Sequence, residues 1–262
     1  MTFQATNDET QLREKRVTAE IIGDADYARL RLTPEPEHNF YLHLQDLRRA
    51  LGECAPEAKG VLLDFGCGSS PYRSLFPNVE YRRADYTPSA GIDYAVRDDQ
   101  TIEEQDGTFD YLLSTQVLEH VRRPEIYLAE CFRLLRPGGT LLLSTHGIFE
   151  EHGCPYDFRR WTADGLAEEL TRAGFAVESL KKLTTGPRAA GFLFHQYGGL
   201  LAPGRRTLSG LLHWFFFRRT KRYFAKMNRR LDRDFADCGV VDAGETGHPL
   251  YIALLAVAAK RA

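Results

Sequence analysis

No hydrophobic run in this 262-residue sequence approaches the roughly 20 apolar residues that a membrane-spanning helix needs. Residues 1–20 are polar and charged and contain no apolar signal core, so we expect no secretory signal. The five cysteines are scattered, form no Cys-x-x-Cys pair and suggest no disulfide framework. Together these absences favour a cytoplasmic protein with free thiols over a secreted or membrane-spanning one.

The sequence also lacks the third glycine of the dinucleotide-binding pattern Gly-x-Gly-x-x-Gly. The apolar run 61–63 is typical of a buried parallel strand, and Asp64 follows at its carboxyl end. Gly66 and Gly68 allow a sharp turn and a close approach of the backbone to a ligand. Pro71 occupies the third glycine position, which disfavours a pyrophosphate-binding helix. Taken alone, the glycine pair would suit a tight turn that binds nothing.

Strand and helix patterns alternate through most of the chain. Apolar residues recur at helical spacing in residues 39–51, and we expect further helices over 124–134 and 162–173. Short apolar or β-rich runs predict strands over residues 61–64, 79–84, 92–96, 111–114, 140–145, 175–183 and 250–259. This alternation predicts an α/β protein with a doubly wound, mostly parallel sheet.

Charge is unevenly distributed, although the formal net charge is only −2. Of the 34 basic and 36 acidic residues, ten basic and one acidic lie within 204–233, which leaves the remainder with 24 and 35, a net charge of −11. Leucine and aromatic residues over 208–217 precede the arginine-rich part. This combination is typical of membrane-surface helices, and it also suits a lid, a dimer surface or a helical cap with solvated arginines.

Several motifs, in their order along the chain, resemble those of class I S-adenosylmethionine-dependent methyltransferases. They are Asp-Phe-Gly-Cys-Gly at 64–68, Asp85, Asp98, Gln-Val-Leu-Glu-His at 116–120 and Leu-Arg-Pro-Gly-Gly at 135–139. Residues 146–147 and 152–162 are similar to a subgroup of small bacterial methyltransferases. The resemblance covers about residues 40–183. It implies a Rossmann-like seven-stranded sheet with an antiparallel last strand, and S-adenosyl-L-methionine as cofactor with S-adenosyl-L-homocysteine as product.

The resemblance also implies roles for individual residues around the cofactor. Gly66 and Gly68 would pass beneath its methionine part, and Asp64 would help to hold the amino end. Asp85 follows Gly68 at a separation typical of a ribose-binding carboxylate, which accepts hydrogen bonds from two vicinal hydroxyls. Asp98 or Asp99 would accept from the adenine amino group, and the spacing favours Asp98. The full expected set is Asp64, Phe65, Gly66, Cys67, Gly68, Asp85, Tyr86, Asp98, Asp99, Ser114, Thr115, Gln116 and His120.

Candidate catalytic residues follow the fifth expected strand. His146 and His152 are candidate bases, with Asp157 as an orienting partner, and His146 is preferred because it leaves the strand beside the cofactor. Each histidine could equally serve the structure of its own loop. Arg159 or Arg160 could pair with an anionic substrate group, but pairing with Asp157 is favoured. The spacing of His146, His152 and Asp157 matches no standard metal site, so we assign no metal.

The chain is expected to divide into an extension (1–38), a methyltransferase core (39–185 and 247–262) and a helical basic and aromatic insertion (186–246). The insertion would be a lid, a homodimer surface or a peripheral membrane contact through residues 205–233. Nucleic acid is disfavoured as substrate, because residues 114–117 read Ser-Thr-Gln-Val and lack the Pro-Pro-aromatic run of amino-methylating DNA enzymes.

We therefore expect methyl transfer to a small-molecule or glycan-like acceptor, with oxygen as the favoured atom. The first alternative is a catalytically silent protein that binds S-adenosylmethionine and acts through its basic insertion. The second is a nicotinamide-dependent oxidoreductase, which Pro71 disfavours.

Overall fold

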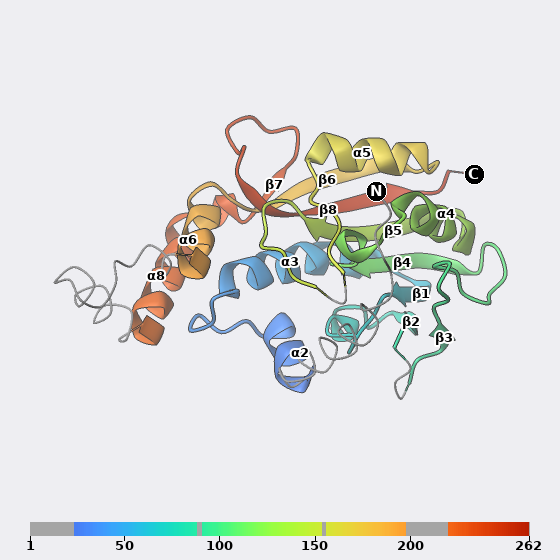
Figure 1. The fold of residues 1–262 in the computed structure, drawn as a ribbon, viewed down its shortest axis with the longest axis horizontal. Helices are drawn as coiled ribbons and strands as arrows, with labels where there is room; N and C mark the ends of the chain where they lie inside the picture. The colour runs from blue at the N-terminus through green and yellow to red at the C-terminus, as the bar shows by residue number, and fades with distance from the viewer. Residues whose placement is uncertain (1–23, 88–90, 154–155, 198–219, 262) are drawn as a thin grey trace, which may run out of the picture.

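The computed structural model describes residues 24–87, 91–153, 156–197 and 220–261, and in them one mixed eight-stranded sheet forms the centre of the molecule (Figure 1). The strands are β1 (Gly60–Phe65), β2 (Val79–Asp85), β3 (Tyr94–Ala95), β4 (Phe109–Thr115), β5 (Leu135–His146), β6 (Ala176–Thr185), β7 (Val240–Asp242) and β8 (Tyr251–Ala259). Their order across the sheet is β3-β2-β1-β4-β5-β8-β6-β7. The helices are α2 (Asp24–Leu32), α3 (Tyr41–Cys54), α4 (Pro124–Leu134), α5 (Ala163–Arg172), α6 (Gly186–Tyr197) and α8 (Thr220–Asp234).

The doubly wound fold predicted from the sequence is confirmed, including its antiparallel last strand. Strand β8 runs antiparallel to both of its neighbours, β5 and β6, and lies between them. The prediction of seven strands was incomplete, because the described residues contain an eighth, β7, which pairs antiparallel with β6 at the sheet edge. Strand β7 was missed because three residues are too few to show an alternating pattern.

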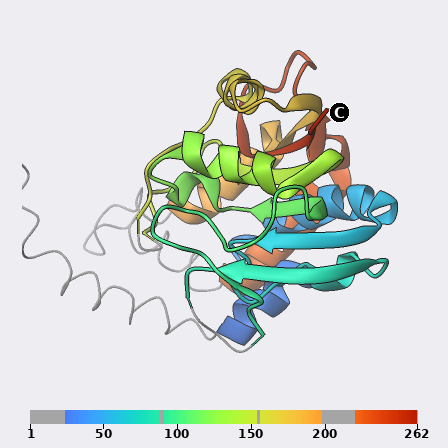
Figure 2. The same cartoon turned by 90° about the vertical axis from the view of Figure 1, so that its right-hand side faces the viewer.

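Apolar side chains fill both faces of the sheet. One cluster packs between the sheet and helices α4 and α5, and it includes Leu128 and Leu166. The other packs between the sheet and helix α3, where Leu47 and Leu51 are fully buried. Because helices cover both faces, a ligand site in such a fold lies at the carboxyl ends of the parallel strands. Figure 2 shows β1 and β2 side by side with their carboxyl ends at one edge of the sheet.

The turn after β1 follows a path that glycine alone takes easily. Gly66 has a φ of +81°, and a Cβ atom there would lie 2.7 Å from Cγ2 of Val117. The backbone of this turn therefore packs directly on the segment that follows β4. The turn is also hydrogen-bonded to β2, because the N–H groups of Gly66 and Cys67 both donate to the carbonyl oxygen of Ala84.

The described part of the insertion is fastened to the core by a buried ionic network. Arg188 on α6 is 1% exposed and donates to both carboxylate oxygens of Asp46 on α3. Thr184 also donates to Asp46, and Arg188 reaches Asp232 on α8 at 2.9 Å. Helices α6 and α8 therefore form a fixed cap at this end of the sheet.

Several sequence predictions fall outside the described residues. These are the basic residues Arg205, Arg206, Arg218 and Arg219 and the aromatic run at 214–217. Within the described residues, three arginines of α8 make surface ion pairs: Arg229 with Glu37, and Arg230 and Arg233 with Asp234. Among the helices of the described part of the chain, none is long and apolar enough to cross a membrane.

Candidate active site

Asp64 lies at the carboxyl end of β1 with a carboxyl group that is only partly hydrogen-bonded. The residue is 2% exposed, and Tyr81 donates to its Oδ2 atom at 2.6 Å. Its Oδ1 atom is buried and makes no aligned hydrogen bond, although the Ser70 side chain lies close enough to lower the pKa of Asp64. Burial raises the pKa of Asp64 to about 6. Such a group would gain from an added cationic or hydrogen-bond-donating ligand.

Asp85 closes the other side of the glycine turn. Its Oδ2 atom accepts from the Gly68 N–H at 2.8 Å, and its Oδ1 atom accepts from the Thr87 N–H at 2.9 Å. Each oxygen keeps a second lone pair, so the carboxylate can still accept from two ligand hydroxyls. The side chains of Phe65 and Cys67 are buried, so these two residues offer a ligand only their backbone.

The segments after β2 and β3 bring Tyr86 near two acidic residues. The Tyr86 side chain is exposed, and its pKa is raised by partial burial and by the charges of Asp98 and Asp99. Asp99 accepts from both the N–H and the hydroxyl of Thr101, and these bonds close its own turn. Asp98 makes no hydrogen bond within the described residues, which leaves it the better placed of the two to meet a ligand.

The end of β4 is held by buried polar contacts. The Tyr127 hydroxyl lies 2.9 Å from Ser114 Oγ and 3.1 Å from the carbonyl oxygen that ends β1, so it ties the two strands together. Gln116 has a φ of +57°, an unusual backbone conformation for this residue type, and donates through its backbone and side chain to Ser144. Thr115 between them is also buried. Sequence reasoning did not find Tyr127, because it lies on α4 and is distant along the chain from the two strand ends that it joins.

His146 lies at the end of β5 and is almost fully buried. Its Nε2 atom is 3.2 Å from Oε1 of Glu119, and its ring stacks on Phe149 with 3.9 Å between centroids. Burial and the neighbouring His43 hold the pKa of His146 well below its usual range, so the ring is neutral. The side chain most favoured as a base from the sequence is therefore enclosed by protein.

Glu119 is a functional candidate that sequence reasoning named only as part of a motif. It lies in the turn Leu118–His120 after β4 and is fully buried. Its Oε2 atom accepts from the Thr145 hydroxyl at 2.8 Å, while Oε1 makes no aligned hydrogen bond. Burial raises the pKa of Glu119 to about 7. The signal in the sequence that could have identified Glu119 as a site residue is its position just after a parallel strand.

A loop held by Asp157 carries His152 toward this turn. Asp157 accepts from the backbone N–H of His152 at 2.9 Å and from Arg160 through both carboxylate oxygens at 2.5 Å. Burial raises the pKa of Asp157, but the bonds from Arg160 and His152 outweigh it and leave that pKa below its usual value. The expected pairing of an arginine with Asp157 is present, through Arg160. Arg159 instead donates to two backbone carbonyls.

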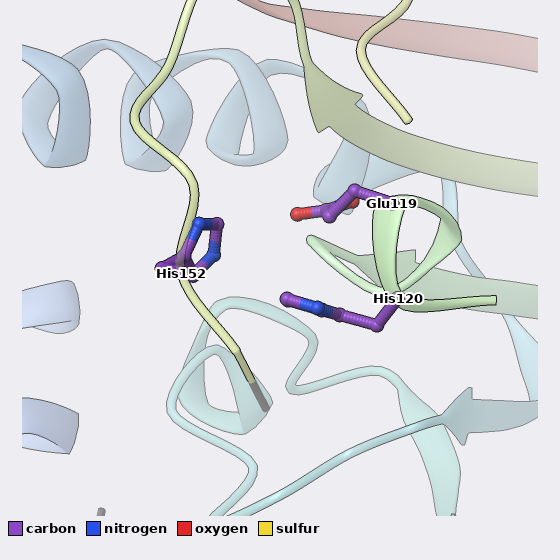
Figure 3. Close-up of side chains that lie close together, drawn as sticks. All are labelled: Glu119, His120 and His152. Carbon is purple, nitrogen blue, oxygen red and sulfur yellow. The ribbon is translucent and has the colours of Figure 1, made fainter. Parts of the chain in front are cut away.

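The structure gathers His120, His146 and His152 into one cluster beside the residues expected to bind the cofactor. The His152 ring centroid lies 5.2 Å from that of His146 and 4.9 Å from that of His120. His120, which we expected on the cofactor side, faces His152 across the site (Figure 3). Asp64, Asp85 and Gln116 lie on the neighbouring strand ends. The site thus has a side rich in carboxylates and backbone N–H groups and a side rich in histidines.

Comparisons with known proteins identify the family. A family model described as a methyltransferase domain matches residues 37–180. One curated relative, a ubiquinone biosynthesis O-methyltransferase from Chelativorans sp. (strain BNC1), is 28% identical over 157 residues, or 54% of this chain and 53% of that protein. Another of the same name, from Caulobacter vibrioides, is 32% identical over 108 residues, or 35% and 42%. The chain spans about half or less of these relatives' lengths.

Two solved structures have a similar fold. One is Burkholderia thailandensis 1,6-didemethyltoxoflavin-N1-methyltransferase with bound S-adenosylhomocysteine, with a TM-score of 0.50 and 14% identity over 99% of this chain and 94% of that one. The other is the (4+2)-cyclase SpnF, with a TM-score of 0.50 and 20% identity over 83% and 81%. At this identity the likeness shows the fold, and the two names indicate that the fold serves more than one reaction.

Proposed function

The chain belongs to the methyltransferase domain family, whose cofactor is S-adenosylmethionine, and on this premise we propose that it transfers a methyl group to an oxygen of a small-molecule or glycan-like acceptor. The observation that carries the proposal is the partly satisfied carboxyl group of Asp64, buried beside the glycine turn. A cofactor with a cationic amino end would supply the partner that this carboxyl group lacks.

Four positions would hold the cofactor. Asp64 would meet its amino group, and Asp85 would use its remaining lone pairs for the ribose hydroxyls. Asp98 would accept from the adenine amino group, beside the exposed ring of Tyr86. Ser114 and its neighbours at the end of β4 would line the sulfonium side.

The histidine cluster would form the acceptor side. The bound cofactor supplies a methyl group on a sulfonium, so the protein must chiefly align an acceptor oxygen and manage its proton. His152 is the most accessible catalytic candidate, with 34% of its side chain exposed, and Asp157 fixes its orientation. We assign acceptor contact to His152, and His146 supports it from behind through Glu119. Oxygen is favoured as the acceptor atom because the curated relatives above are named O-methyltransferases.

The insertion would act as a cover over this acceptor side. Phe192 on α6 lies 5.8 Å from the Phe149 ring and 6.0 Å from the His43 ring, measured between centroids. It packs in a small apolar cluster with Ile252 on β8. We propose that the described helices of the insertion, α6 and α8, form a lid on the core, anchored by Arg188.

Calorimetric titration of S-adenosylmethionine into wild type, Asp85→Ala and Asp106→Ala tests the cofactor assignment. We expect micromolar binding by wild type and at least tenfold weaker binding by Asp85→Ala, about 1.4 kcal/mol or more. Asp106 lies just before β4, is 79% exposed and pairs with Arg133 on α4, so Asp106→Ala should bind like wild type. An absence of binding by wild type would refute the proposal.

Release of S-adenosylhomocysteine, measured with catechol, phenol and amines of matched shape, tests the reaction. We expect release with the hydroxyl compounds, reduced in His152→Ala. Release with the amines alone would contradict oxygen as the acceptor atom. Cofactor binding without release in any mixture would favour the silent binding protein over the enzyme.

A further inference from the structure

Three side chains converge between the turn after β4 and the facing loop. Glu119 and His120 project from the turn, and His152 projects toward them from the loop (Figure 3). Each can offer one ligand atom such that these atoms lie within 4.8 Å of one another. We propose that Glu119, His120 and His152 bind one divalent transition-metal cation. This set differs from the one considered from the sequence, which combined His146 and His152 with Asp157.

The carboxylate of Glu119 gives an independent indication of a ligand. The side chain is fully buried, and its Oε1 atom has no aligned hydrogen-bond partner. The Nε2 atom of His146 lies 3.2 Å from Oε1 but does not form an aligned hydrogen bond with it. A buried carboxylate with an unsatisfied oxygen is costly unless a cation or donor occupies the space beside it.

The two histidines are oriented as metal ligands usually are. Nδ1 of His120 lies 2.6 Å from the carbonyl oxygen of Tyr156, which can only accept, so the ring proton belongs on Nδ1. Nδ1 of His152 likewise faces the carbonyl oxygen of Glu150 at 3.1 Å and Asp157 at 3.4 Å. Both Nε2 atoms are then bare lone pairs, and within the described residues neither has a hydrogen-bond partner. A backbone or carboxylate acceptor behind the ring is the usual outer partner of a metal-bound histidine.

The surrounding charges permit a cation at this point. Arg160 is the nearby positive group acting on Glu119, and both of its terminal nitrogens are paired with Asp157. His146 and His43, the neighbouring histidines outside the cluster, are both buried. The cluster therefore combines one buried carboxylate with two imidazole rings, and its positive neighbour is already paired with Asp157.

The donor set selects the class of cation. Two imidazole nitrogens and one carboxylate oxygen suit Zn²⁺ and neighbouring divalent transition metals better than Mg²⁺ or Ca²⁺, which prefer oxygen. Ligand bonds of about 2.0–2.2 Å would require the three side chains to close in by roughly 1 Å. Three protein ligands leave an open coordination position, which is typical of a catalytic metal site rather than a structural one.

The role of the cation in the reaction rests on the proposed function. The acceptor oxygen would bind the cation held by His152 rather than the imidazole itself. A cation-bound hydroxyl loses its proton more readily. The acceptor oxygen would then attack the methyl carbon as the carbon–sulfur bond breaks toward sulfur, and the released proton would pass to water.

The experiment uses the full chain after dialysis against a chelator. Co²⁺ alone is titrated in and its visible absorption recorded, Zn²⁺ is then used to displace it, and S-adenosylmethionine is titrated calorimetrically into the same preparation. The variants are Glu119→Gln, His152→Ala and a control, His248→Ala. His248 contacts Thr185 and lies outside the cluster. Circular dichroism melting checks folding, and His152→Ala serves as the decisive variant because its side chain is partly exposed.

We expect one equivalent of Co²⁺ to bind and Zn²⁺ to displace it. Binding should weaken at least tenfold in His152→Ala and in folded Glu119→Gln, while His248→Ala matches wild type. Absence of a Co²⁺ spectrum, or equal binding by wild type and His152→Ala, would overturn the site. Cofactor binding without metal binding refutes this inference alone, and metal binding without cofactor binding refutes the proposed function alone.

Discussion

Replacement of Gly66 by alanine should destabilise the fold through two separable effects. The residue has a φ of +81°, where a side chain costs about 1–2 kcal/mol. The added Cβ would also lie 2.7 Å from Cγ2 and 3.0 Å from Cγ1 of Val117. Overpacking of this kind costs about 1–3 kcal/mol more. We therefore expect Gly66→Ala to lower the free energy of unfolding by about 3 kcal/mol.

Gly68 provides the matched control for this prediction. It shares the left-handed conformation, with a φ of +50°, but a Cβ there would meet no atom within 4 Å. Gly68→Ala should therefore cost only the conformational part, about 1–2 kcal/mol. Urea unfolding followed by circular dichroism gives the free energy of unfolding for each variant.

A double-mutant cycle with Val117→Ala tests the contact itself. Shortening Val117 removes the two methyl groups that a Cβ at Gly66 would meet, so the two substitutions should couple favourably by about 1 kcal/mol or more. Purely additive effects, or a Gly66→Ala cost equal to that of Gly68→Ala, would refute the close approach of the turn to the segment after β4.

Two further predictions concern buried charges. Because burial raises the pKa of Asp64 to about 6 and only its ionised form attracts a cationic amino group, the affinity for S-adenosylmethionine should rise as pH increases from 5 to 7 and then level off. Calorimetry of wild type should show this rise and Asp64→Asn should lack it. An equal pH dependence of the affinity in both proteins would show that Asp64 does not bind the amino group. Asp46→Ala leaves Arg188 buried without its main partner, and the free energy of unfolding should fall by about 3–5 kcal/mol. Arg230→Ala, at an exposed pair, should change it by less than about 1 kcal/mol, and a similar loss in both variants would show that the buried pair is not special.

Local patterns were enough to place most of the elements. The helix predicted over 124–134 matches α4, whose start is set by Pro124. Thr162 caps α5 as expected, by accepting from the Gly165 N–H. These features depend on residues a few positions apart, so the sequence displays them directly.

Features made by distant residues could not be read in this way. Asp46 and Arg188 lie 142 positions apart, and nothing near either residue indicates the other. Tyr127 binds the ends of β1 and β4 from a helix face that looked simply apolar. The sequence did bring His146, His152 and Asp157 into one candidate group, which the structure places together. Glu119 was overlooked because its contact with His146 exists only in the folded sheet.

The position of β8 constrains the order in which the sheet can form. Strand β6 pairs with β8, and β7 pairs only with β6, so among the described residues both strands join the rest of the sheet through β8. The β5–β8 pairing joins residues about a hundred positions apart, such as His146 and Ala253, and closing so long a loop is slow. Strands β1 to β5 can therefore assemble first, with β6 waiting for β8. A folding intermediate with native-like strands β1 to β5 and unformed strands β6 to β8 would be the kinetic signature of this arrangement.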